Sequence, residues 1–397
     1  MYNKFAYESG ANSCYIRELA AYAQSRAAVV GPENVYDYSI GNPSLPAPKE
    51  ITDAICQILN DTSPMAVHGY TAAIGNWDTR KAIADDLNSR YEQSITPEEL
   101  FIGCGTSQEL CAVFSALTTP GSKILAIAPY FPEYVPFVQN AGSRFDVVPA
   151  DVPGFQINFE ALEEKLTPDT NALILNSPNN PAGTVYTADT LKKLADLLTA
   201  KGNEFGHPIY IVADEPYREL VYEGVEVPYI PAIYPNTIVC YSYSKSLSLP
   251  GERIGYILVP RQAQDSKALY TAINGASRLI GHICAPSLWQ KVIARCAHLR
   301  PDMTTYTKNR TTLYEGLLKA GYEVAKPDGA FYLFVKVPGG DGFAFSESAK
   351  ELDLFVVPGE EFGCPGYVRV CYCVPFEKIE KSLPLFKKLM EKNWAFL

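Results

Sequence analysis

Short apolar runs alternate with longer stretches of helical periodicity from about residue 48 to residue 260. The runs that we expect to be strands are Leu100–Cys104, Lys123–Ala128, Arg144–Val148, Ala172–Asn176, Ile209–Asp214, Thr237–Tyr241 and Gly255–Val259. The stretches that we expect to be helices include Gly75–Tyr91, Ser107–Thr118, Thr187–Ala200 and Arg261–Leu279. Continuous Val, Ile and Leu strands separated by helices are typical of a mostly parallel sheet covered on both faces. The pattern therefore predicts an α/β fold.

The pattern changes after about residue 300, where strands become fewer and more widely spaced. The elements expected there are Met303–Ala320, Gly329–Val335, Leu354–Val357, Tyr367–Cys371 and Glu377–Asn393. They indicate a smaller α+β domain, and the Pro- and Gly-rich stretch 41–48 is typical of a crossover that leads out of it. We therefore expect a large domain at residues 48–295 and a small domain made of residues 1–47, which include an N-terminal arm, and 296–397.

Composition and charge argue against several classes of partner and ligand. The 397 residues carry a net charge of −10 without a cluster of Lys and Arg, which argues against nucleic acid as a main partner. No apolar run approaches the roughly 20 residues of a membrane span, and the N-terminus lacks a signal-peptide core. Neither the ten scattered cysteines nor the four histidines show metal-site spacing. We expect a cytoplasmic protein with free thiols and no metal.

Polar residues follow several predicted strands, and ligands bind beyond the carboxyl ends of strands in open parallel sheets. Gly105, Thr106 and Ser107 open a helix whose N–H groups could hold an anion, although an ordinary loop explains them equally well. Asn180 lies in a Pro- and Asn-rich turn that turn formation alone could explain. Asp214 ends an apolar strand, where a carboxylate needs a cationic or hydrogen-bonded partner. The alternative for Asp214 is that it caps a following helix.

One lysine stands out, in the segment Ser242-x-x-Lys245 directly after a predicted strand. An amine desolvated at a sheet edge loses its charge readily and becomes a nucleophile toward an aldehyde. Arg253 and the hydroxyls of Ser242 and Ser244 could hold a dianionic phosphate nearby. Together they indicate a Schiff-base lysine and pyridoxal phosphate. The Ser-x-x-Lys pattern of penicillin-recognising hydrolases is a weaker alternative, because the sequence lacks their Ser-Asp-Asn and Lys-Thr-Gly motifs and places Ser242 at a strand exit instead of a helix start.

Taken in order, these motifs resemble the class I/II aminotransferases, aspartate aminotransferase-like pyridoxal-phosphate enzymes of fold type I. The resemblance rests on Gly105-Thr106-Ser107, Asn180-Pro181-Ala182-Gly183, Asp214-x-x-Tyr217, Ser242-x-x-Lys245, Arg253-x-Gly255 and Arg369. It extends over essentially the whole chain. Ala182 stands where the family usually has Thr, a departure that concerns the turn and not the amide of Asn180. The resemblance implies a large domain with a mostly parallel, mixed sheet flanked by helices, and a smaller α+β domain.

The resemblance implies a role for each residue around the cofactor, pyridoxal 5′-phosphate. Lys245 would form the Schiff base and then move a proton between the substrate Cα and the cofactor. Asp214 would keep the pyridine nitrogen protonated. Tyr217 and Asn180 would hydrogen-bond the 3′-oxygen, and Phe131 would stack on the ring.

The resemblance also implies which residues bind the cofactor phosphate and the substrate. The implied phosphate ligands are Gly105, Thr106, Ser107, Ser242 and Arg253. Tyr70 would reach the phosphate of a neighbouring subunit, which implies a homodimer with shared active sites. Arg369, flanked by apolar residues, would bind the substrate α-carboxylate beside Gly41 and Asn180. Arg278 is a candidate for reading a side-chain carboxylate across the dimer.

The function implied by the resemblance is ping-pong transfer of an amino group between an amino acid and a 2-oxo acid, with aspartate or glutamate as candidate substrates. A pyridoxal-phosphate-dependent C–S β-lyase acting on cystathionine or cysteine conjugates is the alternative. Both enzymes would use Lys245 and Asp214, so the motifs do not separate them. A DNA-binding regulator on the same fold is disfavoured, because residues before about 40 leave no room for a DNA-binding domain.

Overall fold

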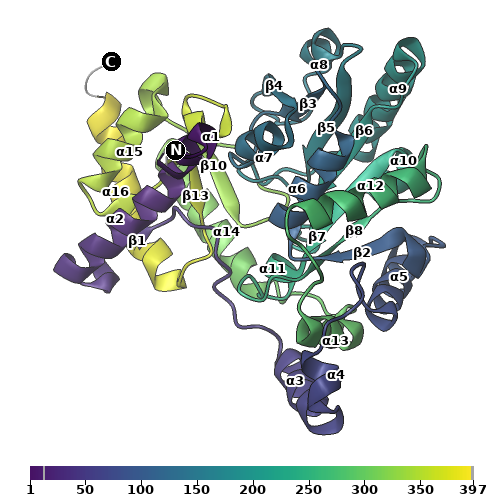
Figure 1. The fold of residues 1–397 in the computed structure, drawn as a ribbon. Helices are drawn as coiled ribbons and strands as arrows, with labels where there is room; N and C mark the ends of the chain where they lie inside the picture. Colours follow the sequence, from purple (N-terminus) through teal and green to yellow (C-terminus); the bar gives the residue numbers. More distant parts are fainter. Residues whose placement is uncertain (12–13, 395–397) are drawn as a thin grey trace.

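The apolar runs in the middle of the chain form a seven-stranded sheet within residues 1–11 and 14–394, the part that the computed structural model describes (Figure 1). Its strands are β2 (Leu100–Gly103), β3 (Lys123–Ile127), β4 (Arg144–Val148), β5 (Thr170–Asn176), β6 (Tyr210–Asp214), β7 (Thr237–Ser242) and β8 (Gly255–Leu258). Their order is β2-β8-β7-β6-β5-β3-β4. β8 runs antiparallel to both of its neighbours and all other pairs are parallel. The predicted mostly parallel, mixed sheet is confirmed.

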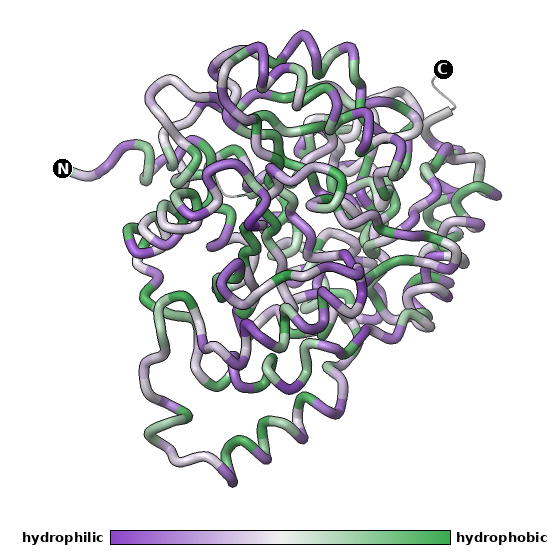
Figure 2. The backbone as a smooth tube through the Cα atoms, turned by 90° about the vertical axis from the view of Figure 1, so that its right-hand side faces the viewer, coloured by the Kyte–Doolittle hydropathy of each residue, from purple (hydrophilic) through white to green (hydrophobic). Residues whose placement is uncertain are grey.

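Helices cover both faces of this sheet. The helices described in this part of the chain are α3 (Lys49–Asp61), α4 (Pro64–His68), α5 (Trp77–Tyr91), α6 (Thr106–Leu117), α7 (Tyr134–Ala141), α8 (Phe159–Lys165), α9 (Ala188–Phe205), α10 (Ile230–Ile233), α11 (Tyr243–Ser246), α12 (Ser266–Leu279) and α13 (Ser287–Cys296). Successive strand residues point to opposite faces, so Ile124 packs in one apolar core and Leu125 in the other. Figure 2 shows these apolar segments inside and hydrophilic segments toward the periphery.

A second, antiparallel sheet gathers the C-terminal part of the chain. Among the described residues its order is β12-β13-β10-β9, and a separate pair joins β1 to β11. The strands are β1 (Tyr36–Asp37), β9 (Glu323–Val324), β10 (Tyr332–Lys336), β11 (Leu354–Phe355), β12 (Val357–Pro358) and β13 (Tyr367–Cys371). The helices are α1 (Lys4–Ala11), α2 (Tyr15–Val30), α14 (Thr304–Lys319), α15 (Gly342–Lys350) and α16 (Phe376–Trp394). Parallel pairing of Tyr36 with Leu354 places the N-terminal segment on this smaller part, as Figure 1 shows.

Most predicted elements begin and end within a few residues of the observed ones. One expectation about the site is corrected, and one alternative is excluded. Ser242 was expected outside a helix start, but its side chain caps α11 by accepting a hydrogen bond from the Ser244 amide. Asp214 does not cap a helix, because a turn follows it and α10 begins only at Ile230. None of the described helices is long and apolar enough to cross a membrane.

Candidate active site

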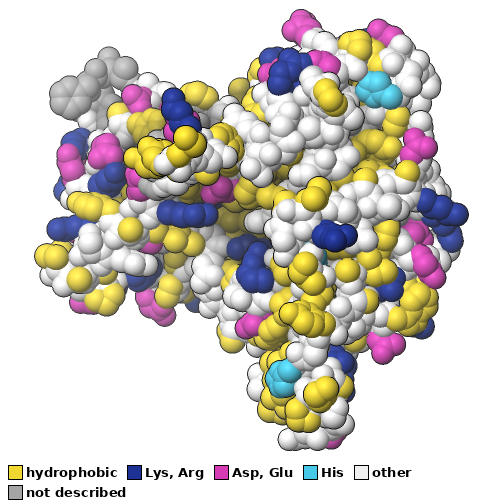
Figure 3. All heavy atoms as spheres, viewed as in Figure 1, with side chains coloured by type: hydrophobic (Ala, Val, Ile, Leu, Met, Phe, Trp, Pro, Cys, Tyr) yellow, Lys and Arg dark blue, Asp and Glu magenta, His cyan; other side chains and the backbone are white. Residues whose placement is uncertain are grey.

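A cavity of about 250 Å³ lies at the carboxyl edge of the large sheet, where the smaller part meets it. The predicted site residues among its lining are Gly41, Thr106, Ser107, Phe131, Asn180, Asp214, Tyr217, Ser242, Lys245, Arg253 and Arg369. In Figure 3 the molecule is hollowed between the two parts, with Lys or Arg side chains near the hollow. A larger cavity of about 630 Å³, lined by Leu117, Pro168 and Leu269, holds none of the predicted residues. Its lining brings together no comparable set of reactive groups, so the smaller cavity is the candidate site.

Lys245 reaches this cavity from α11, directly after β7. Its Nζ donates a hydrogen bond of 2.5 Å to the carbonyl oxygen of Gly41. Burial is the main reason that the pKa of Lys245 is lowered, and the nearby thiols of Cys373 and Cys371 oppose this effect only in part. A lowered pKa favours the neutral amine, which is the nucleophilic form.

Asp214 is the last residue of β6 and is almost fully buried. The Tyr134 hydroxyl donates a 2.6 Å hydrogen bond to Oδ2, and the Asn176 side chain donates to the Asp214 carbonyl at 2.8 Å. Oδ1 is buried and has no hydrogen-bond partner among the described residues. Burial raises the pKa of Asp214 to about 7, although the bond from Tyr134 works against this. A cation at Oδ1 would therefore be needed to hold this carboxylate firmly ionised.

An anion cradle lies between the start of α6 and the segment before β8. Gly105 has φ of +84°, and a Cβ there would lie 2.7 Å from Arg253 Nη2, so only glycine leaves the guanidinium its space. The Ser242 and Ser244 hydroxyls are 2.7 Å apart, and Arg253 Nη1 lies 3.4 Å from Ser244 Oγ. The N-terminus of α6 at Thr106 adds backbone donors.

Arg369 enters the cavity from β13 in the smaller sheet and is 2% exposed. Its Nη1 donates to Asn180 Oδ1 at 2.9 Å, and its Nη2 donates to the Ser39 carbonyl. The guanidinium lies over the Tyr332 ring, 4.8 Å from its centroid. Nε is buried without a hydrogen-bond partner in the described part of the chain. The fixed guanidinium is suited to bind a carboxylate.

Two aromatic residues complete the lining. The Tyr217 and Tyr332 hydroxyls are 2.8 Å apart, and burial raises the pKa of Tyr217, so it is a neutral hydrogen-bonding group. Phe131 packs edge-on against Tyr134, with ring centroids 5.6 Å apart.

Three predicted residues are not part of the cavity lining. Gly105 lies behind it, against Arg253, and the other two are on the surface. Tyr70 is 93% exposed, and Arg278 is exposed in the last turn of α12. Both were assigned roles across a dimer, so the single chain neither brings them to the site nor tests those roles.

Several cavity residues were not identified from the sequence. Asn176 contacts Asp214, Tyr332 contacts Tyr217 and Arg369, and Ile16 of α2 also lines the cavity. Tyr134 lies behind the lining and holds Asp214. Asn176 could have been found, since it ends a strand beside Asp214. Tyr332 and Ile16 lie in segments whose approach to the large sheet depends on the tertiary fold.

The donor set of the cavity fits pyridoxal phosphate. The unpartnered Asp214 Oδ1 suits a pyridinium N–H, and the cradle between Gly105 and Arg253 suits a phosphate. The Lys245 amine suits an aldehyde carbon. Within the described residues, no group of three or more His, Cys, Asp or Glu side chains is placed to hold a metal ion.

Comparison with known proteins gives the family. The family model described as aminotransferase class I and II matches residues 33–383. Aspartate aminotransferase of Thermotoga maritima is 29% identical over 91% of this chain and 93% of its own length. A probable aspartate/prephenate aminotransferase of Thermus aquaticus is 30% identical over 88% of this chain and 90% of its own. These names do not favour the C–S lyase alternative.

Solved structures agree with the sequence relatives. An amino transferase from Eubacterium rectale is 51% identical, with a TM-score of 0.97 and 99% coverage of both chains. Aspartate aminotransferase from Thermus thermophilus with maleate is 27% identical, with a TM-score of 0.81 and coverage of 95% of this chain and 96% of that one. The lysine, the buried carboxylate and the buried arginine of the cavity therefore belong to a fold-type-I transaminase, and this chain is a member of the class I and II aminotransferase family.

Proposed function

We propose that this aminotransferase binds pyridoxal phosphate in the cavity at Lys245 and exchanges amino groups between an amino acid and a 2-oxo acid in a ping-pong cycle. The observation that carries the proposal is the shared cavity of Lys245, whose amine is favoured in its neutral form, and Asp214, whose buried Oδ1 lacks a partner. When bound, the cofactor supplies an aldehyde for the amine and a protonated ring that withdraws electrons from the substrate Cα.

The chain's own residues would hold and orient the cofactor. Asp214 would accept the ring N–H at Oδ1, while Tyr134 keeps Oδ2 in place. Asn180 still has its Nδ2 to donate to the 3′-oxygen, since its Oδ1 is occupied by Arg369. Tyr217 would hydrogen-bond the same oxygen, and Phe131 would stack on the ring.

The remaining polar groups would hold the phosphate and the substrate. Ser242, Arg253 and the start of α6 at Thr106 and Ser107 would bind the phosphate. Arg369 would bind the substrate α-carboxylate and orient the Cα–H bond toward Lys245. The neutral Nζ of Lys245 would then take the Cα proton and return it on the cofactor side.

Replacement of Lys245 by alanine tests the proposal. We expect the purified variant to lose the visible absorbance of the lysine-bound cofactor, and turnover should fall by about 10⁴-fold or more because the base and the covalent anchor are both removed. Lys267→Ala, which changes an exposed lysine of α12, is the matched control. Normal transamination by Lys245→Ala would refute the assignment.

We further propose aspartate or glutamate as a substrate, as the names of the relatives suggest. The cations that line the cavity are Lys245, Arg253 and Arg369, and each has a role that leaves none for a second carboxylate. A cation from another subunit would therefore be required, and Arg278 is our candidate.

Arg278→Leu tests this substrate proposal. The variant should reduce kcat/KM for aspartate by roughly 100-fold and that for alanine by less than about threefold, because only the acidic side chain would lose an ion pair. Lys267→Leu on the same helix is the control. Equal losses for both substrates would exclude Arg278 from side-chain recognition.

We also propose that the enzyme is a cytoplasmic homodimer whose partner contributes Tyr70. The high exposure of Tyr70 in the single chain supports a role outside its own cavity. All ten cysteines are free thiols, as suits a reducing compartment.

A further inference from the structure

Two cysteines lie beside the arginine of the active site. Arg369 and Cys371 belong to the same strand and, two residues apart, share a face, while Cys373 follows just beyond the strand end. The two Sγ atoms are 2.8 Å apart and both residues are buried. Cys373 Sγ also lies 3.7 Å from the carbonyl of Ile40, the residue before the Gly41 that accepts from Lys245. The thiols therefore lie next to Ile40 and Arg369, which line the cavity.

The charges around this pair favour a thiolate. Burial acts to raise the pKa of Cys371, but the hydrogen bond from the Cys373 S–H and the positive charge of Arg369 are the main effects that oppose it, and the pKa is lowered. The pKa of Cys373 is raised by burial and by its bond to Cys371. Cys371 is therefore the preferred thiolate and Cys373 the thiol that donates to it. A thiolate is the form that reacts with oxidants.

We propose that Cys371 and Cys373 are a reversible oxidation site at which peroxide forms a disulfide and weakens binding of the amino acid substrate. The Cys371 thiolate attacks one oxygen of hydrogen peroxide, the O–O bond breaks, and a sulfenic acid and water result after protonation. Cys373 then attacks the sulfenic sulfur and releases a second water. Overall, two thiols and one peroxide give one disulfide and two waters. A dithiol reductant reverses the change by thiol–disulfide exchange and is itself oxidised to a disulfide.

The disulfide would act on substrate binding through Arg369. It removes the thiolate that balances the charge of Arg369, and it ties the end of β13 to the residue two positions beyond. We expect KM for the amino acid to rise by about threefold or more, with a smaller change in kcat, since ground-state binding is what is lost. This kinetic effect rests on the proposed role of Arg369, whereas formation of the disulfide does not.

Peroxide treatment of the cofactor-loaded enzyme tests the site. After alkylation of the remaining thiols, mass spectrometry of the peptide that contains Cys371 and Cys373 should show an internal disulfide. Dithiothreitol should reduce this disulfide and return KM to its untreated value. The exposed Cys56 provides the matched control, because Cys56→Ser should leave both effects intact. Cys371→Ser and Cys373→Ala should each abolish the linkage and the peroxide-dependent change in KM, measured against their own untreated values.

The outcomes separate the two parts of the proposal. If both thiols remain alkylatable after peroxide treatment, or if only Cys56 and other thiols are oxidised, the site is refuted. A disulfide that forms without a change in KM refutes the link to Arg369. Circular dichroism of each variant identifies a folding defect, and the mass-spectrometric result on wild-type protein stands independently of the variants.

Discussion

At the scale of single residues, burial shifts two ionisable groups of the cavity toward their neutral forms. It raises the pKa of Asp214 to about 7 and lowers that of Lys245. For Asp214 the Tyr134 hydroxyl compensates only in part, because a neutral donor stabilises an ion less than a cation does. The chain alone thus holds an amine ready to react and a carboxyl that needs a cation.

The raised pKa of Asp214 predicts a pH-dependent stability of the cofactor-free protein. The folded state binds the proton more tightly than the unfolded chain, so this contribution is complete below about pH 4 and is lost as the pH rises through about 7. Asp214→Asn removes the titration. The free energy of unfolding of the wild type should therefore fall, relative to the variant, by about 4 kcal/mol across this range. Urea unfolding at stepped pH measures the difference, and a constant difference would contradict the expectation.

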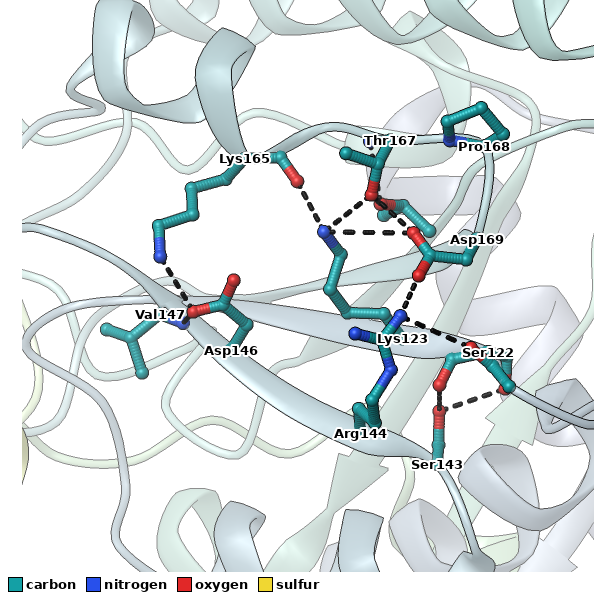
Figure 4. A network of polar contacts seen from close by, with 12 residues as sticks. Ser122, Lys123, Ser143, Arg144, Asp146, Val147, Lys165, Thr167, Pro168 and Asp169 are labelled. Atoms are coloured by element: carbon teal, nitrogen blue, oxygen red, sulfur yellow. Dashed lines mark hydrogen bonds and ion pairs between the residues drawn. The ribbon is translucent and has the colours of Figure 1, made fainter.

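At the scale of elements, the two ends of the parallel strands have different roles. Residues at the carboxyl ends line the cavity, and residues at the opposite ends form structural contacts. The carboxyl ends of β2, β5, β6 and β7 lead to the residues of the cavity. The opposite edge holds the polar network of Figure 4, in which Lys123 at the start of β3 donates to the Lys165 carbonyl and to Thr167 Oγ1, both at 2.6 Å. Arg144 pairs with Asp169 in the same network. These contacts fasten the connection between α8 and β5.

Lys123→Met should lower stability without changing catalysis. The substitution leaves the Lys165 carbonyl without its donor, so we expect a loss of about 1–3 kcal/mol in the free energy of unfolding. The values of kcat and KM should stay at wild-type levels because the network lies at the edge away from the cavity. Urea unfolding and steady-state kinetics measure the two effects. Lys192→Met is the control, since the one ion pair of Lys192 among the described residues is with the exposed Asp189.

At the scale of the whole molecule, the cavity is assembled from two parts of the chain. The large sheet supplies Lys245 and Asp214, while Gly41 and Arg369 come from the N-terminal segment and from the smaller sheet. Substrate would therefore be held between a cofactor on one part and an arginine on the other. In our proposal, Tyr70 and Arg278 each contribute to the cavity of the other subunit of a dimer.

Mixed dimers test whether sites are shared. If Tyr70 serves the partner's cavity, a dimer of one Lys245→Ala chain and one Tyr70→Phe chain contains one site with both changes and one site with neither. Such mixtures should show more activity than either homodimer, approaching half of the wild-type value after correction for the fraction of mixed dimers. A mixture that only averages the two homodimers would show that Tyr70 acts in the site of its own chain, and it would refute the shared site.

The sheet and many site residues could be predicted because their signals are local. Each strand is a continuous apolar run, and Asp214, Asn180 and Lys245 follow such runs at the edge where parallel strands place ligands. Ser242 was misplaced relative to α11, because a four-residue helix gives no periodic signal. Tyr332 could not be predicted, since its contact with Tyr217 joins residues 115 positions apart.

The sequence by itself determined the order of strands and helices, the family resemblance and the residues at the strand ends, because these depend on short-range pattern and residue chemistry. Only the tertiary structure decided which groups are buried together, and burial sets the charge of Asp214 and Lys245. It also brought Cys371 and Cys373 into contact beside Arg369, which residue spacing alone does not show. Reactivity here depends on desolvation and on neighbouring charges, and both arise only when distant segments pack.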